Sequence, residues 1–265
     1  MLARISAAVQ EGRLLSSLKT RAANASREWQ LRRRLGLRLG RSAVLWTNRR
    51  SPSARHLISA FEAADNSSVT LPNEVRAIEG MSGQKYRSFI NRLVQLTPDP
   101  KYLEIGSWAG STACAAMSGN RVEALCIDDW SLFGGPKEAF FANVSRIKTP
   151  EISFKFIEQD FRSIDFSALG KFNLYLFDGP HTEQDQYDGV LIAGPALRDK
   201  FVLIVDDWNW NWVRFGTFQA IADSDITVQC AVEIRTTHDN THPVVSGRES
   251  DWHNGYFIAA LKKGA

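Results

Sequence analysis

Acidic side chains follow four successive apolar segments in the middle of this 265-residue sequence. The segments end at Asp128-Asp129, at Glu158-Gln159-Asp160, at Asp178 and at Asp206-Asp207. Open α/β sheets bind their ligands at the carboxyl ends of the strands. One acid at such a place could simply cap a helix, and Asp178 could do so for the helix expected from Glu183. Acids at all four places instead favour a polar ligand site at one edge of a sheet.

A glycine-containing turn precedes these acids, in the stretch KYLEIGSWAGST from Lys101 to Thr112. An apolar run ends at Gly106, Gly110 follows, and residues that favour a helix begin at Ser111. This pattern predicts a buried strand, a tight turn and a helix start, where backbone N–H groups can approach a ligand closely. The spacing differs from the G-x-G-x-x-G of dinucleotide dehydrogenases, which disfavours a nicotinamide cofactor. An ordinary turn between a strand and a helix remains the alternative.

Glu104 lies inside the end of the predicted strand, where a buried carboxylate is costly unless a positive or hydrogen-bonding group meets it. S-adenosylmethionine has such a group in its α-amino nitrogen. Asp128 lies 22 residues after Gly106, about where an acid reaches a ribose diol. Asp160 and Phe161 suit the edge and face of an adenine. The expected cofactor contacts are Glu104, Gly106, Ser107, Gly110, Ser111, Asp128, Asp160, Phe161, Met81 and Ser82.

Strands and helices alternate regularly in the part of the sequence that carries these residues. The expected strands are 102–105, 122–127, 153–157, 172–177 and 201–205, and the expected helices are 111–117, 137–147, 183–197 and 212–222. Near-continuous apolar strands that alternate with helices specify a parallel sheet covered on both faces. Two further strand segments, 226–234 and 255–261, have no long helix between them and predict an antiparallel hairpin. The expected fold is α/β, a Rossmann-like doubly wound sheet of seven strands, mostly parallel with a C-terminal antiparallel hairpin.

Charge divides the chain into two parts. Residues 1–57 hold thirteen Lys and Arg and two Glu, a net charge of +11, whereas the remainder holds 19 basic and 27 acidic residues, a net charge of −8. We therefore expect a basic extension over 1–57, helical or partly disordered, then a linker and lead-in helix over 58–100, and the ligand-binding domain over 101–265. The extension could bind an anionic membrane surface or nucleic acid, serve as an organelle-targeting peptide, or remain a solvated arm. Formation of a homo-oligomer also stays open.

Composition excludes several other classes of protein. No apolar run approaches the ~20 residues that span a bilayer. The three cysteines, Cys114, Cys126 and Cys230, form no CxxC pair and lie in apolar surroundings, which disfavours disulfides and a zinc site. We expect reduced core thiols and a cytoplasmic location, with peripheral membrane attachment and organelle targeting left open.

Five segments in order, LEIGSWAGST, CIDDW, EQDF, FDGPH and VDDW, resemble the class I S-adenosylmethionine-dependent methyltransferases. More narrowly, Asp178-x-x-His181 together with Asp206-Asp207 resembles the macrocin/mycinamicin sugar O-methyltransferase group and its relatives. The resemblance covers about residues 80–263 and implies a methyltransferase domain over 101–265. Substrate segments specific to macrolides are not evident in this sequence.

The resemblance implies a metal-assisted methylation of a hydroxyl group on a sugar, a glycan or another small molecule. In that group, Mg²⁺ is held by the acids that match Asp178, Asp206 and Asp207, and the histidine that matches His181 is the proposed base. An alcohol is a poor nucleophile until its proton is removed, and coordination to Mg²⁺ lowers the pKa of a hydroxyl. His181 could then accept the proton. Alternatively, His181 only forms a hydrogen bond, and Asp207 only orients Asp206.

Two other kinds of function remain open at this stage. A nucleic-acid methyltransferase would use the arginine-rich extension to bind phosphates, although the sequence lacks the Asn/Asp-Pro-Pro-Tyr segment of enzymes that methylate amino groups. A non-catalytic cofactor-binding protein would keep the fold alone, against which the complete set of Asp178, His181 and Asp206 argues. Trp208, Trp210 and Trp212 could wall an acceptor pocket.

Overall fold

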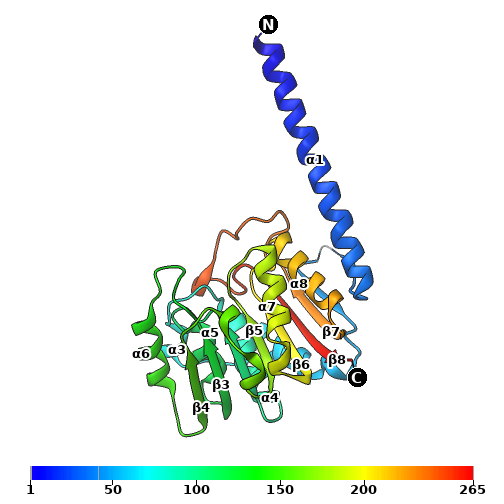
Figure 1. Ribbon diagram of the computed structural model, residues 1–265. Coiled ribbons are helices and arrows are strands. Elements are labelled where there is room, and N and C mark those ends of the chain that lie inside the picture. Colours follow the sequence, from blue (N-terminus) through cyan, green and yellow to red (C-terminus); the bar gives the residue numbers. More distant parts are fainter. Residues whose placement is uncertain (1, 41, 265) are drawn as a thin grey trace.

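A computed structural model describes residues 2–40 and 42–264, with side chains described from residue 18 onward. Eight strands of these residues form one sheet in the order β1-β7-β8-β6-β5-β2-β3-β4 (Figure 1). The strands are β1 (Val44–Thr47), β2 (Lys101–Ile105), β3 (Val122–Ile127), β4 (Ile152–Ile157), β5 (Phe172–Phe177), β6 (Leu197–Val205), β7 (Ile226–Ile234) and β8 (Tyr256–Lys263). The helices are α1 (Leu2–Arg34), α2 (Arg55–Asp65), α3 (Asn73–Arg76), α4 (Gln84–Leu96), α5 (Ser111–Met117), α6 (Lys137–Ile147), α7 (Glu183–Ile192) and α8 (Asn211–Asp223).

The expected Rossmann-like α/β fold is confirmed, including its C-terminal hairpin. Strands β2, β3, β4, β5 and β6 pair in parallel, whereas β8 pairs antiparallel with both β6 and β7. The strand order reverses between β5 and β2, so the carboxyl ends of these two strands flank the place where ligands bind in open α/β sheets. All seven expected strands are present, and β1 is an eighth that the sequence pattern did not predict.

Both faces of the sheet are covered, which explains why its strands are apolar without alternation. Tyr102 of β2 faces a core shared with α2, α4, α5 and α6, whereas its neighbour Leu103 faces a second core shared with α7 and α8. Successive residues of a strand point to opposite faces, so a strand buried on both sides must be apolar throughout. This rigid central sheet fixes the positions at which the strand ends present their polar residues.

The N-terminal segment lies differently from the expected extension. Figure 1 shows α1 projecting from the body at its start and meeting the domain at its end, where it packs against α8. Leu31 and Leu37 are buried in the core beside α8. Strand β1 then pairs antiparallel with β7, Val44 opposite Ile234, and covers that edge of the sheet. The last turns of α1 and β1 are thus part of the domain, so the expected boundary at residue 57 does not separate two bodies.

The segment expected as a linker is also part of the core. Leu57, Ala60 and Ala64 of α2 are buried against α4, whose Phe89 and Leu93 are fully buried. Helix α4 begins at Gln84, after an irregular segment, residues 77–83, whose Met81 lines the ligand cavity. Helices α2 and α4 therefore pack on one face of the sheet and are not a linker that precedes it.

The cysteines are core residues, as expected. Cys114, Cys126 and Cys230 are buried and form no disulfide, and burial raises the pKa of the Cys114 thiol to about 12. None of the described helices combines the length and the hydropathy that a membrane span requires.

Candidate active site

A cavity of about 500 Å³ lies at the carboxyl ends of the parallel strands. It extends from the segments after β3 and β4, across the adjacent turns after β2 and β5, to the turn after β6. Nine of the predicted site residues line it: Met81, Gly106, Asp128, Asp160, Phe161, Asp178, His181, Asp206 and Asp207. The other five predicted residues, Glu104, Ser107, Gly110, Ser111 and Ser82, lie behind its wall and do not line it.

The turn after β2 is held by the carboxylate of Asp128. Oδ2 of Asp128 accepts hydrogen bonds from the backbone N–H groups of Ser107, at 2.8 Å, and Trp108, at 2.9 Å. Its Oδ1 accepts one from the N–H of Trp130, at 2.8 Å. Asp128 lines the cavity, so its contact with a ribose stays a prediction, and both of its oxygens accept hydrogen bonds from the loops beside the cavity. Asp129, which the prediction did not single out, is exposed and lines the same wall.

A glycine is required at position 106 because the backbone of Asp178 leaves no room for a side chain. Its φ is +86°, and a Cβ built on it would lie 1.9 Å from the backbone oxygen of Asp178. The turn after β2 and the turn after β5 are therefore packed backbone against backbone. Gly110 has a φ of +82°, and a Cβ there would approach the ring of Phe140 at 2.9 Å. The close packing keeps the two ends of the cavity within reach of a single ligand.

Glu104 is fully buried behind the turn and receives a hydrogen bond from the hydroxyl of Tyr102. Its Oε1 has no hydrogen-bond partner among the described residues. Burial raises the pKa of Glu104 to about 8, since the hydrogen bond from Tyr102 only partly offsets the desolvation. A buried carboxylate with a free oxygen is suited to a cationic group of a ligand.

Serine side chains link the segment before α4 to the start of α5. Oγ of Ser82 and Oγ of Ser111 lie 2.8 Å apart, and Nε of Arg87 donates to Ser82 at 2.9 Å. Arg87 is fully buried, and its remaining contacts are hydrogen bonds to backbone oxygens of residues 75, 76 and 78. These bonds tie the segment of Met81, which lines the cavity, to the start of α5.

Asp160 and Phe161 stand at the end of β4. Asp160 is exposed and caps a short helical turn, because its Oδ1 accepts from the N–H of Arg162 at 3.0 Å. Phe161 is buried and packs edge-on against Phe177, with ring centroids 5.4 Å apart. The aromatic neighbour expected for an adenine is thus a wall residue of the cavity.

The four residues predicted for catalysis or metal binding come together at the other end of the cavity. Nε2 of His181 lies 2.8 Å from Oδ2 of Asp207 and 3.7 Å from Oδ1 of Asp178. Asn254 donates to the other oxygen of Asp207 at 2.6 Å. The N–H of Asp207 donates to Oδ1 of Asp206, also at 2.6 Å. Convergence of these side chains follows from the adjacency of β5 and β6 in the sheet.

The electrostatics of this cluster are unusual for aspartates. Burial, together with the charge of Asp207, raises the pKa of Asp178 to about 6, although His181 acts in the opposite direction. Burial and the charges of Asp178 and Asp207 raise the pKa of Asp206 further. Burial would also raise the pKa of Asp207, but contacts with His181 and Asn254 outweigh it and lower that pKa. Burial alone would lower the pKa of His181, but Asp178 and Asp207 raise it to about 10. The cluster thus combines three carboxyl groups with a single cationic side chain, that of His181.

The donor set of Asp178, Asp206 and Asp207 is chemically suited to Mg²⁺, which prefers carboxylate oxygens. The arrangement of the side chains is less suited to it. Among the described residues, no group of three or more His, Cys, Asp or Glu side chains is gathered as a metal site. His181 instead lies against the aspartates, and its Nε2 makes no well-directed hydrogen bond with them. The structure therefore brings the predicted ligands together without the geometry of a metal centre.

Aromatic residues and histidines line the side of the cavity beyond His181. Trp210 stacks on Trp212, and the rings of His181 and His242 stand edge-on against Trp210. Nδ1 of His253 accepts from the N–H of Gly247 at 2.8 Å, which fixes its ring in the cavity wall. Trp208, which was considered for this wall, is fully buried beneath it. His242 and Ser246 were not predicted, because they lie in a 21-residue connection between β7 and β8 without a spacing signal.

Backbone strain concentrates around the cavity. Trp108, Trp130, Asp207 and His253 are non-glycine residues with positive φ, between +40° and +59°. Such conformations cost about 1–3 kcal/mol each and cluster at functional sites. Phe133, with a φ of +51°, is a further such residue, and it lines the cavity together with Trp108, Asp207 and His253.

Comparisons with known proteins agree with this placement. Residues 103–208 match the family model of a methyltransferase domain. Among solved structures, cofactor-bound Rv0187 from MTB shares 17% identity over 80% of this chain and 91% of its own, with a TM-score of 0.51. The O-methyltransferase from Bacillus cereus in complex with SAH shares 16% identity over 78% of this chain and 91% of its own, with a TM-score of 0.46. The SAH-bound methyltransferase PaMTH1 of Podospora anserina shares 16% identity over 79% and 88%, with a TM-score of 0.47.

A comparison with curated proteins gave no match. The structural similarity supports the fold, and the family match covers the strands from β2 to the end of β6 that surround the cavity. It does not distinguish the macrocin/mycinamicin group from other methyltransferases. The matched residues include the turn at Gly106, the acid at Asp128 and the cluster around Asp178 and Asp206. Residues 103–208 of this chain, which surround the cavity, are therefore similar to a methyltransferase domain.

Proposed function

We propose that the protein is an S-adenosylmethionine-dependent O-methyltransferase that acts on a hydroxyl of a sugar, a glycan or another small molecule. The observation that carries the proposal is the single cavity that joins the turn at Gly106 to the cluster of Asp178, His181, Asp206 and Asp207. Methyl transfer is an in-line displacement, so a cofactor and an acceptor must meet in one enclosed space. The cavity supplies such a space, with the cofactor motif at one end and candidate proton acceptors at the other.

The cofactor would lie over the turn after β2. Asp128 holds that turn through the N–H groups of Ser107 and Trp108, and Asp129 lies beside it for a ribose hydroxyl. Phe161 offers an apolar wall for the adenine. Glu104 does not itself line the cavity but directly precedes Ile105 and Gly106, which do, and its free carboxylate oxygen is the proposed partner of the α-amino group. Solved structures with a similar fold were determined with SAH or a cofactor bound, which supports the same cofactor here.

His181 is the proposed base for the acceptor hydroxyl. It lies in the cavity wall between the cofactor turn and the ring of Trp210. A base must be neutral before it accepts a proton, whereas Asp178 and Asp207 raise the pKa of His181 to about 10. Proton transfer to His181 therefore requires that another positive charge reach the aspartates or that one of them become protonated.

Magnesium is the proposed source of that charge. Asp178, Asp206 and Asp207 would hold the ion, and their mutual repulsion, seen in the raised pKa values of Asp178 and Asp206, supports a cation at this place. A bound Mg²⁺ would lower the pKa of an acceptor hydroxyl.

The acceptor is proposed to be a ring with a free hydroxyl. Trp210, His242 and His253 present aromatic faces to the part of the cavity next to His181, and such faces suit sugar rings. The test is incubation of the protein with isotopically labelled S-adenosylmethionine and pools of glycosides, phenols and RNA, followed by mass spectrometry. A labelled methyl ether on a hydroxyl supports the proposal, whereas label only on a nucleobase would support a nucleic-acid methyltransferase. Lack of cofactor binding in calorimetry would overturn the assignment.

The basic segment offers limited support for the nucleic-acid alternative. Nη1 of Arg27 donates to Glu183 at 2.9 Å, Arg32 is buried against Glu233, and Arg34 pairs with Asp223 at 3.2 Å. These arginines of α1 are engaged with acids of the domain itself. Attachment to an anionic surface remains a proposal for the residues before Arg27, where Lys19 and Arg21 are exposed.

A further inference from the structure

A buried ion pair joins α1 to the edge of the sheet. The guanidinium of Arg32 donates from Nη1 to Oε1 and from Nη2 to Oε2 of Glu233 on β7, each at 2.6 Å. The two side chains are only 5% and 2% exposed. Removal of one partner from such a pair leaves an uncompensated buried charge. The ion pair is therefore a specific attachment of α1 to β7. In the sequence, Arg32 is far from the residues that line the cavity.

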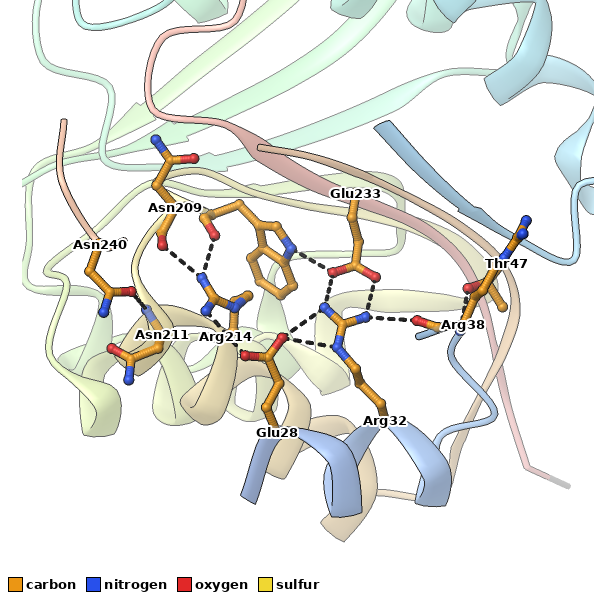
Figure 2. A network of polar contacts seen from close by, with 10 residues as sticks. Glu28, Arg32, Arg38, Thr47, Asn209, Asn211, Arg214, Glu233 and Asn240 are labelled. Atoms are coloured by element: carbon orange, nitrogen blue, oxygen red, sulfur yellow. Dashed lines mark hydrogen bonds and ion pairs between the residues drawn. The ribbon is translucent and has the colours of Figure 1, made fainter. Parts of the chain in front are cut away.

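The same carboxylate binds the residue that follows the aspartate pair. Nε1 of Trp208 donates to Oε2 of Glu233 at 2.9 Å. Trp208 is fully buried and its ring stacks on Phe257 with centroids 4.6 Å apart. Glu233 thus lies between Arg32 of α1 and the turn that begins at Asp206, as Figure 2 shows.

A second path reaches the same turn through Glu28. Oε1 of Glu28 accepts from Nε of Arg32 at 2.9 Å, and its Oε2 accepts from Nη2 of Arg214 at 3.1 Å. Nη1 of Arg214 donates to the backbone oxygens of Trp208, at 2.9 Å, and Asn209, at 2.7 Å. One turn of α1 is therefore linked to the segment after Asp207 by two routes, through Glu233 to the side chain of Trp208 and through Arg214 to the backbone (Figure 2).

The turn in question carries a cavity residue in a strained conformation. Asp207 has a φ of +56°. The side-chain amide of Asn209 donates to Oδ1 of Asn254 at 2.8 Å, and Asn254 donates to Asp207 at 2.6 Å. A positive φ in a residue other than glycine persists only where the surroundings fix it. On the side away from the cavity, the turn that carries Asp207 is held by a hydrogen-bond network of five residues: Glu28, Arg32, Arg214, Glu233 and Trp208.

We propose that Arg32 and Glu28 of α1 are positioning residues for the active site, which act through Trp208 and Asn209 to hold Asp207 against His181. The proposal rests on the methyl-transfer function proposed above. It makes the end of α1 part of the catalytic unit, although none of the α1 side chains described, from residue 18 onward, lines the cavity. Arg32 and Glu28 do not contact the reacting atoms, so their effect is on the geometry of Asp207 and not on cofactor binding.

The test compares full-length variants that alter one link at a time. Arg32→Lys keeps the charge but loses the paired hydrogen bonds. Glu28→Gln removes the negative charge and leaves one acceptor oxygen where Arg32 and Arg214 now use two. Trp208→Phe removes the indole N–H together with part of the buried ring. Arg33→Ala is the matched control, since Arg33 is the exposed neighbour in the same helix and rests on Trp29 alone. We expect kcat to fall roughly 10- to 100-fold in Arg32→Lys and Trp208→Phe, with the Kd for S-adenosylmethionine within about twofold of wild type. The Arg32→Lys/Trp208→Phe double variant should lose less than the product of the single losses, because both act through Glu233.

Nuclear magnetic resonance supplies a readout that does not depend on turnover. The ring resonances of His181 and the indole N–H of Trp208 should shift in Arg32→Lys and stay in place in Arg33→Ala. Unchanged kcat and unchanged His181 resonances in both Arg32→Lys and Trp208→Phe would overturn the proposal. Equal losses of cofactor affinity and of kcat would also overturn it, because they would show a general loss of structure. A wild-type protein that binds no cofactor would instead overturn the proposed function, while shifted His181 resonances would still support the positioning.

Discussion

Nε2 of His181 lies 2.8 Å from Oδ2 of Asp207, and Asn254 donates to the second oxygen of the same carboxylate at 2.6 Å. The two contacts fix one aspartate of the cluster and lower its pKa, whereas those of Asp178 and Asp206 are raised. Environments that give neighbouring carboxyl groups widely different pKa values mark sites of proton transfer or charge stabilisation. Asp207 is the charged partner of His181. Asp178 and Asp206 are the carboxyl groups whose negative charge a further cation would stabilise.

Substitutions in the cluster should separate turnover from cofactor binding. We expect Asp178→Asn and Asp206→Asn to abolish turnover, and His181→Ala to lower kcat roughly 10²–10⁴-fold, the usual contribution of a positioned base. The Kd for S-adenosylmethionine, measured by calorimetry, should change little. Asp251→Asn is the control, because that carboxylate is 63% exposed and contacts only Lys85 among cations. A His181→Ala enzyme with wild-type kcat would leave the histidine a structural role.

Removal of divalent cations should distinguish two uses of the same carboxylates. If Asp178, Asp206 and Asp207 hold Mg²⁺ during turnover, excess EDTA abolishes activity and added Mg²⁺ restores it, while cofactor affinity stays the same. Full activity in EDTA would mean that His181, which already lies on Asp207 and Asp178, supplies the only counter-charge in the cluster. Turnover measured in EDTA, with and without a return of Mg²⁺, decides between these outcomes.

Asp128 and Asp129 provide a matched pair for the cofactor end. Asp128→Ala frees three backbone N–H groups, at residues 107, 108 and 130, and should weaken cofactor binding by about 1–3 kcal/mol through a loosened turn. Asp129→Asn leaves these hydrogen bonds in place and tests a direct contact with ribose. Calorimetry with S-adenosylmethionine and its demethylated product measures both. If neither variant binds more weakly than wild type, this wall does not contact the cofactor.

Cofactor binding should release a proton from Glu104. Burial raises the pKa of Glu104 to about 8, so the group is mostly protonated at pH 7 in the free protein. An α-amino group placed against it would stabilise the carboxylate and displace about one proton per cofactor. Calorimetry in buffers of different ionisation enthalpy measures that release. Glu104→Gln should bind more weakly and release no proton, and an equal release from that variant would exclude Glu104 as the source.

Glu104 should also make the stability of the free protein depend on pH. Its pKa is raised on folding from an ordinary 4.5 to about 8, so the folded state holds the proton more tightly than the unfolded state. The free energy of unfolding should therefore fall as pH rises from about 4.5 to about 8, by a few kcal/mol. Urea denaturation across this range should show a smaller decline in Glu104→Gln. Parallel curves for the two proteins would show that Glu104 is not the group responsible.

The sequence predicted the core of the fold because the parallel strands carry their signal locally. The runs of apolar residues at β2, β3, β5 and β6 are largely buried on both faces. An acid marks the end of β3, β5 and β6, and Gly106 marks the end of β2. Strand β1 escaped prediction since it has four residues, Val44–Thr47, in a basic stretch. Its assignment depends on β7, almost two hundred residues away, and no local pattern reveals such a partner.

The candidate site was predictable to the same extent. Asp178, His181, Asp206 and Asp207 could be placed because adjacent strands bring their ends together. The pairing of Arg32 with Glu233 could not, because an arginine in a run of arginines looks like a solvated surface. The roles of Asp128 and Asp160 as caps of loops also depend on backbone N–H groups, which have no sequence signature. The wall of His242 and Ser246 lies in a connection whose course only the folded chain shows.

The pairing of β1 with β7 has a consequence for biosynthesis. The ribosome completes Val44 long before Ile234, the residue opposite it in the finished sheet. At about 5–20 residues per second, the intervening chain takes roughly 10–40 s to emerge. Throughout that interval the nascent N-terminal segment has neither its sheet partner nor the carboxylate that neutralises Arg32. Its thirteen basic residues, counted to residue 57, would meanwhile keep this waiting segment solvated and resistant to premature association.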